Sequence, residues 1–160
     1  MIAVIGCGNL NRGDDGVGPT VIGALRSRGL EQSGVRLFDA GVDGMATMFA
    51  ARGCRSLIII DAGRSGSEPG AVFEVPGHEL EQPHAPALNL HDFRWDHALH
   101  AGRRIFRDDF PSDVVVLLVE AASLEFGIGL TPVVARAAAA VANRVEALVA
   151  ARLAADPAGS

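Results

Sequence analysis

The sequence between residues 6 and 18 reads Gly6-Cys7-Gly8-Asn9-Leu10-Asn11-Arg12-Gly13-Asp14-Asp15-Gly16-Val17-Gly18. The apolar run Ile2–Ile5 before it predicts a buried strand, and the apolar spacing after it, from about Val17 to Arg28, predicts a helix. A strand, a glycine-rich turn and a helix in this order begin an α/β unit. The turn carries two adjacent carboxylates and no lysine, so it suits a cation better than a phosphate.

Apolar strands and helical patterns continue to alternate along the rest of the chain. Strands are predicted at Val35–Phe38, Leu57–Ile60, Ala71–Val75 and Val114–Val119, and helices near Met45–Phe49, Asp92–Phe106 and Pro132–Leu153. We therefore expect an α/β fold, a three-layer α/β/α sandwich around a mostly parallel, twisted sheet of about five strands. Ala71–Val75 alternates in polarity, which predicts one antiparallel edge strand. Residues 1–155 should form a single domain, and residues 156–160 a frayed tail.

The composition excludes several classes of protein. The chain has 160 residues, 49% of them hydrophobic, with a net charge of −5, and all of its basic residues are arginine. Without lysine there is no Schiff base and no P-loop, and no basic stripe interleaved with aromatics indicates a nucleic-acid partner. No apolar run approaches the roughly 20 residues that span a bilayer, so we expect a cytoplasmic protein with no membrane partner. Cys7 and Cys54 are expected to be reduced thiols.

Four acidic residues follow the predicted parallel strands. Asp39, Asp61 and Glu120 each come directly after a strand, and Asp15 lies in the loop after the first strand. The carboxyl ends of parallel strands meet at one edge of a sheet, where ligands of such folds bind. A cluster of like charges is costly unless a cation or bound protons compensate for it. The sequence therefore predicts a cation site or an acid–base site at this edge.

The adjacent pair Asp14 and Asp15 allows more than one interpretation. One of the two is expected to cap the first helix, and we assign that role to Asp14. Neighbouring side chains at a helix start point in different directions, so Asp15 would face the edge of the sheet. The Gly-x-Gly turn, with Asp39 as a ribose-binding acid, is a weak dinucleotide signal because both carboxylates would repel a pyrophosphate.

Three histidines in one segment are candidate ligands. His91 opens a predicted helix after the long loop Pro76–Leu90, and His97 and His100 share a face of that helix. His91 and His97 are about 240° apart on a helix, so they do not easily bind one ion. Two carboxylates and one imidazole suit nickel, zinc or manganese. The sequence has neither an HExxH motif nor paired cysteines, which argues against an ordinary zinc site.

Five motifs occur in order over nearly the whole chain. They are Gly8–Gly18, Asp39–Gly44, Ile58–Ala62, Ser123–Glu125 and Gly127–Pro132. Together they resemble the motifs of the [NiFe]-hydrogenase maturation endopeptidases, which remove a C-terminal peptide from the hydrogenase large subunit. The chain departs from the family pattern in having Ala121 and Ala122 where the family has a proline before Ser-Leu-Glu.

The resemblance implies a site and a partner. It implies a metal site formed by Asp15, Asp61 and His91, which recognises nickel already inserted in the large-subunit precursor, and no nucleotide cofactor. It also implies peptide-bond hydrolysis, for which Asp39 is our candidate auxiliary acid–base group. Whether His97 or Glu120 contributes to the site stays open.

Two other functions remain compatible with the sequence. The chain has no obvious nucleophile, so a metal-binding docking or chaperone module that does not cut the large subunit is the first alternative. A nucleotide-dependent oxidoreductase on the same sheet is the second.

Overall fold

Five strands form one mixed sheet in the computed structural model, which describes residues 1–83 and 94–156. The strands are β1 (Ile2–Cys7), β2 (Val35–Gly41), β3 (Ser56–Gly63), β4 (Val72–Pro76) and β5 (Asp113–Glu120). Their order is β2-β1-β3-β5-β4. All neighbours are parallel except β4, which pairs antiparallel with β5 at the edge. The predicted mostly parallel sheet and its antiparallel edge strand are confirmed.

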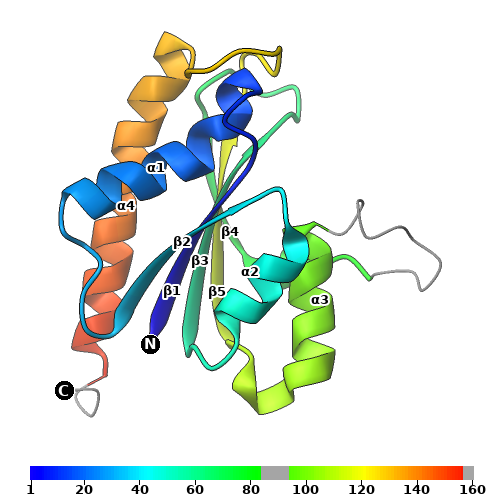
Figure 1. Ribbon diagram of the computed structural model, residues 1–160, viewed down its shortest axis with the longest axis vertical. Helices are drawn as coiled ribbons and strands as arrows, with labels where there is room; N and C mark the ends of the chain where they lie inside the picture. Colours follow the sequence, from blue (N-terminus) through cyan, green and yellow to red (C-terminus); the bar gives the residue numbers. More distant parts are fainter. Residues whose placement is uncertain (84–93, 157–160) are drawn as a thin grey trace.

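In the described part of the chain, four α-helices cover the two faces of this sheet. They are α1 (Val17–Ser27), α2 (Gly44–Ala51), α3 (Trp95–Phe106) and α4 (Pro132–Ala154). Figure 1 shows α1 and α4 on one face and α2 and α3 on the other, so the predicted three-layer arrangement is confirmed. The predictions for His91, for residues 84–90 of the long loop and for the tail residues 157–160 lie outside the described residues.

The strands bury both of their faces. In β1, Ile2 and Val4 pack into the core beneath α1 and α4, while Ala3 and Ile5 pack into the core beneath α2 and α3. The three central strands follow the same alternation between two cores. This explains why they are nearly continuous apolar runs, as parallel strands covered on both sides usually are.

The glycine-rich turn lets α1 begin directly against the sheet. A Cβ on Gly18 would lie 2.6 Å from both the backbone nitrogen of Cys7 and the carbonyl oxygen of Ile60, closer than real Cβ atoms come to other atoms. Packing of the helix onto β1 and β3 therefore requires glycine at this position. The turn has this structural role whatever ligand it faces.

We expect Gly18→Ala to destabilise the protein by about 3 kcal/mol, because the methyl group meets backbone atoms that cannot move aside without displacing α1. Gly23→Ala is the matched control on the same helix, since a Cβ there meets no atom within 4 Å. That substitution should stabilise the protein by about 0.5–1 kcal/mol through the higher helix propensity of alanine. Urea unfolding measures both, and equal stabilities of the two variants would contradict the close approach.

No helix in residues 1–83 and 94–156 combines the length and the apolar character needed to cross a membrane.

Candidate active site

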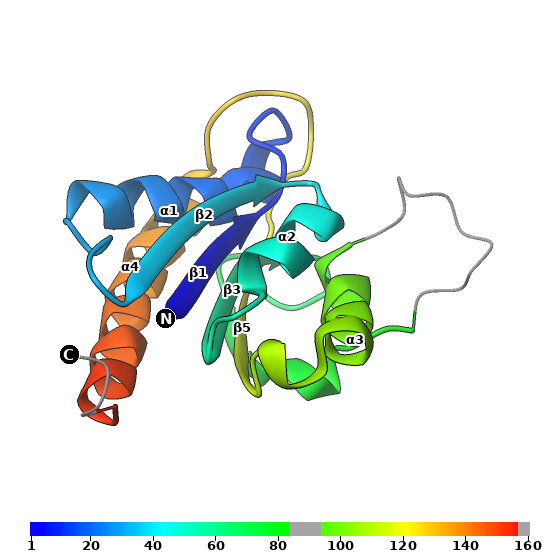
Figure 2. The ribbon, with the colours of Figure 1, turned by 60° about the horizontal axis from the view of Figure 1, so that its bottom comes forward.

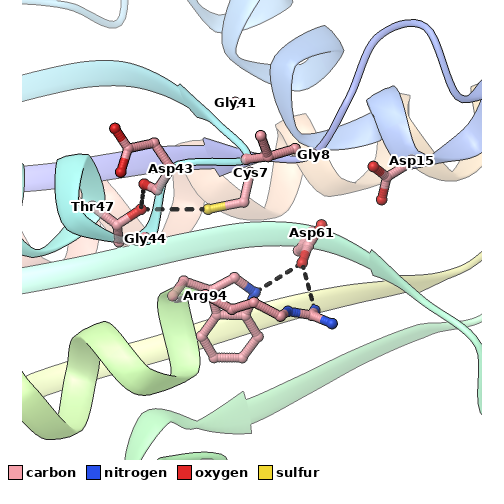
Figure 3. Close-up of a pocket in the computed structure, with 11 residues that line it drawn as sticks. Cys7, Gly8, Asp15, Gly41, Asp43, Gly44, Thr47, Asp61 and Arg94 are labelled. Atoms are coloured by element: carbon pink, nitrogen blue, oxygen red, sulfur yellow. Dashed lines mark hydrogen bonds and ion pairs between the residues drawn. The ribbon is translucent and has the colours of Figure 1, made fainter. Parts of the chain in front are cut away.

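A cavity of about 250 Å³ opens at the carboxyl ends of β1, β2 and β3. Its lining residues come from the turn after β1, the start of α2, the end of β3 and the start of α3 (Figure 3). They are Cys7, Gly8, Asp15, Gly41, Val42, Asp43, Gly44, Thr47, Asp61, Arg94 and Trp95. Figure 2 shows α2 and α3 side by side on one face of the sheet. The structure thus brings Asp15 and Asp61, two of the three predicted metal ligands, to one cavity.

Asp61 lies on β3 and is only 5% exposed. One carboxylate oxygen accepts a hydrogen bond from the indole Nε1 of Trp95 at 2.8 Å, and the other accepts from the backbone N–H of Ala62 at 2.8 Å. The guanidinium of Arg94 is 3.7 Å away. Burial, with a smaller contribution from the charge of Asp15, raises the pKa of Asp61 to about 7 although these three partners oppose the shift. The carboxylate is therefore held in one orientation at the cavity wall.

Asp15 lies on the short 3-10 helix η1 (Gly13–Gly16) that joins β1 to α1. Its carboxylate accepts a hydrogen bond from the backbone N–H of Asn9 at 2.7 Å, and the side chain is half-buried. Figure 3 shows the side chains of Asp15 and Asp61 toward the same end of the cavity. One carboxylate oxygen of Asp15 has no hydrogen-bond donor among the described residues and is available to a ligand.

The prediction that Asp14 caps the first helix is wrong. The N-cap of α1 is Gly16, and no side chain caps that helix. Asp14 is completely buried and accepts hydrogen bonds from the backbone N–H groups of Ala122, Ser123 and Thr131 at 2.8–3.0 Å and from the Thr131 hydroxyl. Because tertiary donors surround it, Asp14 fastens the loop before α4. Asp14 and Asp15 thus bind different partners, since Asp15 accepts from the N–H of Asn9.

Asp39 lies beside the cavity rather than in it. Its carboxylate is exposed and accepts a hydrogen bond from the backbone N–H of Gly41 at 2.9 Å. It lines a separate pocket that shares Gly8, Gly41 and Val42 with the main cavity. A substrate chain that extends over this glycine backbone would reach both.

Glu120, the fourth predicted acid, holds a loop. Its carboxylate accepts hydrogen bonds from the backbone N–H groups of Ser65 and Gly66 and from the Ser65 hydroxyl at 2.9–3.1 Å. It does not line the cavity. Its position at the edge of the sheet matches the expectation from sequence, but the structure does not bring it to Asp15 and Asp61.

His91, the predicted histidine ligand, lies outside the described part of the chain. Within residues 1–83 and 94–156, no group of three His, Cys, Asp or Glu side chains could hold a metal ion. His97 is on α3, where its imidazole accepts from the backbone N–H of Arg94, and it does not line the cavity. The donor chemistry fits a cation nonetheless, because two carboxylates share the cavity and the positive charge of Arg94 approaches the buried one.

Sequence reasoning did not anticipate several cavity residues. Asp43 accepts from the N–H of Ala46 and caps α2, which its position before a helical pattern could have indicated. The contact between Trp95 and Asp61 joins residues separated by 34 positions, and no local pattern records it.

Cys7 is buried at the cavity wall, where its sulfur is 3.8 Å from the hydroxyl of Thr47. Burial, followed by the nearby charge of Asp61, raises the pKa of this thiol far above its ordinary value. A protonated thiol is a poor nucleophile. We therefore expect Cys7→Ala to stay within about threefold of the wild-type cleavage rate, since a buried free cysteine acts as a small apolar side chain. A folded Cys7→Ala variant that cleaves more than about tenfold slower than wild type would contradict this prediction.

Comparison with known proteins identifies the family. The family model described as hydrogenase maturation protease matches residues 19–148. The chain belongs to the hydrogenase maturation protease family. It is 31% identical over 134 residues to the hydrogenase 2 maturation protease of Escherichia coli K12, covering 83% of this chain and 80% of that protein. The structure of the hydrogenase maturating endopeptidase HybD from E. coli superposes with a TM-score of 0.78 at 26% identity, covering 94% of this chain and 93% of that one.

A second relative is longer than this chain. The hydrogenase expression/formation protein HupD of Thiocapsa roseopersicina is 29% identical over 133 residues, which span 82% of this chain and 59% of that protein. Membership in a family of maturation endopeptidases confirms the resemblance drawn from the five motifs. It also excludes the nucleotide-dependent oxidoreductase as an interpretation of the glycine-rich turn.

Proposed function

We propose that this hydrogenase maturation protease removes the C-terminal extension of a [NiFe]-hydrogenase large-subunit precursor after nickel insertion. The nickel is part of the substrate, and Asp15, Asp61 and His91 recognise it. The observation that carries the proposal is the meeting of Asp15 and Asp61, which are 46 positions apart, at one cavity that Gly41 and Gly44 also line. Its cytoplasmic location remains a prediction.

The two carboxylates are prepared to bind a cation. Hydrogen bonds from Trp95 and Ala62 fix the orientation of Asp61, and the N–H of Asn9 fixes Asp15. Such fixed outer partners position metal ligands and tune their basicity. A cation between the two acids relieves their mutual repulsion, a role that the guanidinium of Arg94 fills for Asp61 here. The precursor's nickel would therefore take over from Arg94 the role of positive partner to the Asp61 carboxylate.

Nickel held in this way acts as a template for cleavage. It places the scissile peptide bond of the precursor against the cavity wall, where Gly41 and Gly44 let a substrate backbone approach closely. A water molecule would attack the peptide carbonyl and give up a proton to a carboxylate, and the leaving nitrogen would take up a proton as its bond to the carbonyl carbon breaks. The substrate's nickel would polarise the water or the carbonyl. Asp39, in the adjoining pocket, is the candidate group for the accompanying proton transfer.

Incubation of the purified protein with a nickel-loaded large-subunit precursor tests the proposal. Intact-mass measurement should show loss of a single C-terminal peptide and release of the matching fragment. Tight binding without any change in mass would favour the docking-module alternative. That alternative is compatible with the structure because the protonated thiol of Cys7 is a poor nucleophile. If the folded protein neither binds nor cleaves the precursor, both the protease and the docking-module functions are overturned.

A further inference from the structure

A second groove, of about 580 Å³, lies outside the candidate active site. Three loops form it, namely residues 8–13 after β1, residues 64–71 after β3 and residues 121–131 after β5, which lie together near the top of Figure 1. Its lining residues are Arg12, Arg64, Ala122, Ser123, Leu124, Glu125 and Phe126. The active-site cavity shares none of these residues.

The groove is held in place by the backbone. The N–H of Gly127 donates to the carbonyl of Asn11, and the N–H of Gly13 donates to the carbonyl of Gly127, both at 2.9 Å. Asp14 adds its hydrogen bonds to the same loop. The loop that carries Phe126 is therefore fastened to the segment that also carries Asp15. A surface ordered before binding costs less conformational entropy when a partner docks.

Two guanidinium groups in the groove have no carboxylate partner among the described residues. Arg12 stacks over the ring of Phe126, 3.9 Å from its centroid, and Arg64 donates a hydrogen bond to the carbonyl of Ala122 at 3.3 Å. Stacking on the ring leaves the N–H edge of Arg12 free for a bidentate contact. Glu125 also lines the groove, so the local charge is one net positive in a chain whose net charge is −5.

Exposed apolar side chains lie on the loops that form the groove, and one of them, Phe126, lines it. Ile128 is 86% exposed, Phe126 79% and Leu10 47%, and the first two are the most exposed large hydrophobic residues of the described chain. All three lie on the loops that the backbone hydrogen bonds join. Apolar and aromatic side chains next to arginine are typical of surfaces that bind another protein.

We propose that this groove binds the C-terminal extension of the large-subunit precursor through a carboxylate of that extension, held by Arg12 and Arg64. The inference rests on the proposed function, under which the extension leaves the active site and ends in a free carboxylate. The groove adjoins the active-site turn along the chain, since Arg12 is the N-cap of η1, the short helix that carries Asp15. Phe126 and Ile128 pack against apolar side chains of the extension, while Glu125 disfavours additional negative charge.

The double variant Arg12→Gln/Arg64→Gln tests the groove. Its dissociation constant for the nickel-loaded precursor, measured by calorimetry, should rise at least about tenfold and lose most of its salt dependence. In the cleavage assay KM should rise while kcat stays unchanged. Glu125→Gln should tighten binding. The matched control Arg36→Gln/Arg104→Gln removes the same charge from exposed positions outside the groove and should bind as wild type does.

Synthetic peptides of the extension identify the carboxylate. The free-acid peptide should compete with the precursor for the wild-type protein. If the C-terminally amidated peptide does not compete, the terminal carboxylate is the group that binds the arginines. If the peptide with Asp and Glu replaced by Asn and Gln does not compete, that group is a side-chain carboxylate. The proposal is overturned by equal competition from all three peptides, by no competition from the free acid, or by a thermally stable Arg12→Gln/Arg64→Gln variant that binds as wild type does. Because binding is read directly, this outcome is separate from a failure of wild-type protein to cleave.

Discussion

Asp61→Asn and Asp15→Asn are each expected to lower the rate of precursor cleavage by about 100-fold or more, because each removes a charged oxygen ligand from the cavity. Asparagine keeps the size of the side chain, so the cavity keeps its shape. The double variant should lose little more than either single variant, since in the proposed site the two carboxylates act on one ion. Initial rates with nickel-loaded precursor, followed by intact mass, give the comparison.

Loss of activity in Asp61→Asn must be separated from loss of folding. Burial raises the pKa of Asp61 to about 7, so the native protein holds this proton more tightly than the unfolded chain does. The contribution of this group to the free energy of unfolding therefore falls as the pH rises from about 4 to about 7. The neutral variant lacks this slope. We expect its stability relative to wild type to improve over that range in urea unfolding.

The exposed residue Asp108 provides the activity control. It lies on the short 3-10 helix η4 (Arg107–Asp109), away from the cavity, and Asp108→Asn should cleave at the wild-type rate. Wild-type rates in folded Asp15→Asn and Asp61→Asn proteins would refute the assigned metal site.

Asp14→Ala is expected to destabilise the protein by about 3–4 kcal/mol, although Asp14 does not reach the cavity. The substitution leaves three backbone N–H groups and one hydroxyl without their acceptor, and each unsatisfied buried donor costs about 1 kcal/mol or more. This is a large part of the roughly 5–15 kcal/mol that holds a domain folded. Asp43→Ala is the matched control, because it removes one exposed helix cap at a cost of about 1 kcal/mol.

The effect of Asp14 should depend on pH. Burial opposes its ionisation, but hydrogen bonds from Ser123, Thr131 and Ala122 outweigh burial and lower its pKa below the ordinary 3.8. The stabilisation is therefore complete above that value and is lost as the pH falls through the lower, native pKa. Urea unfolding of wild type and Asp14→Asn should converge on acidification. A difference that stays constant down to the lowest accessible pH would contradict the hydrogen-bonded, ionised carboxylate.

The fold could be predicted from local sequence patterns because the spacing of apolar residues in each strand and helix reflects which of its faces is buried. The apolar run of β3 and the alternation of β4 predicted a buried strand and an edge strand, and both are found. The rule that strand ends meet at one edge then predicted that Asp15 and Asp61 lie together. The error at Asp14 arose because helix capping is a local rule, whereas its partners Ala122 and Thr131 are more than 100 residues away.

The remaining features of the site depend on tertiary contacts. No local pattern pairs Trp95 or Arg94 with Asp61, and their contacts with its carboxylate form only once α3 packs against β3. The position of Glu120 directly after a strand also made it a candidate for the site, but it does not line the cavity. Its carboxylate instead accepts hydrogen bonds from the backbone of the loop after β3. Strand ends therefore bring acids to one edge, but donors nearby decide which of them face the ligand.

The most direct test of the central claim is a paired cleavage assay with nickel-loaded and nickel-free forms of the same large-subunit precursor. The wild-type protein should release the C-terminal extension from the loaded form and leave the nickel-free form intact, because only the loaded form gives Asp15 and Asp61 an ion to bind. Equal cleavage of both forms would contradict recognition of the substrate's nickel at this site.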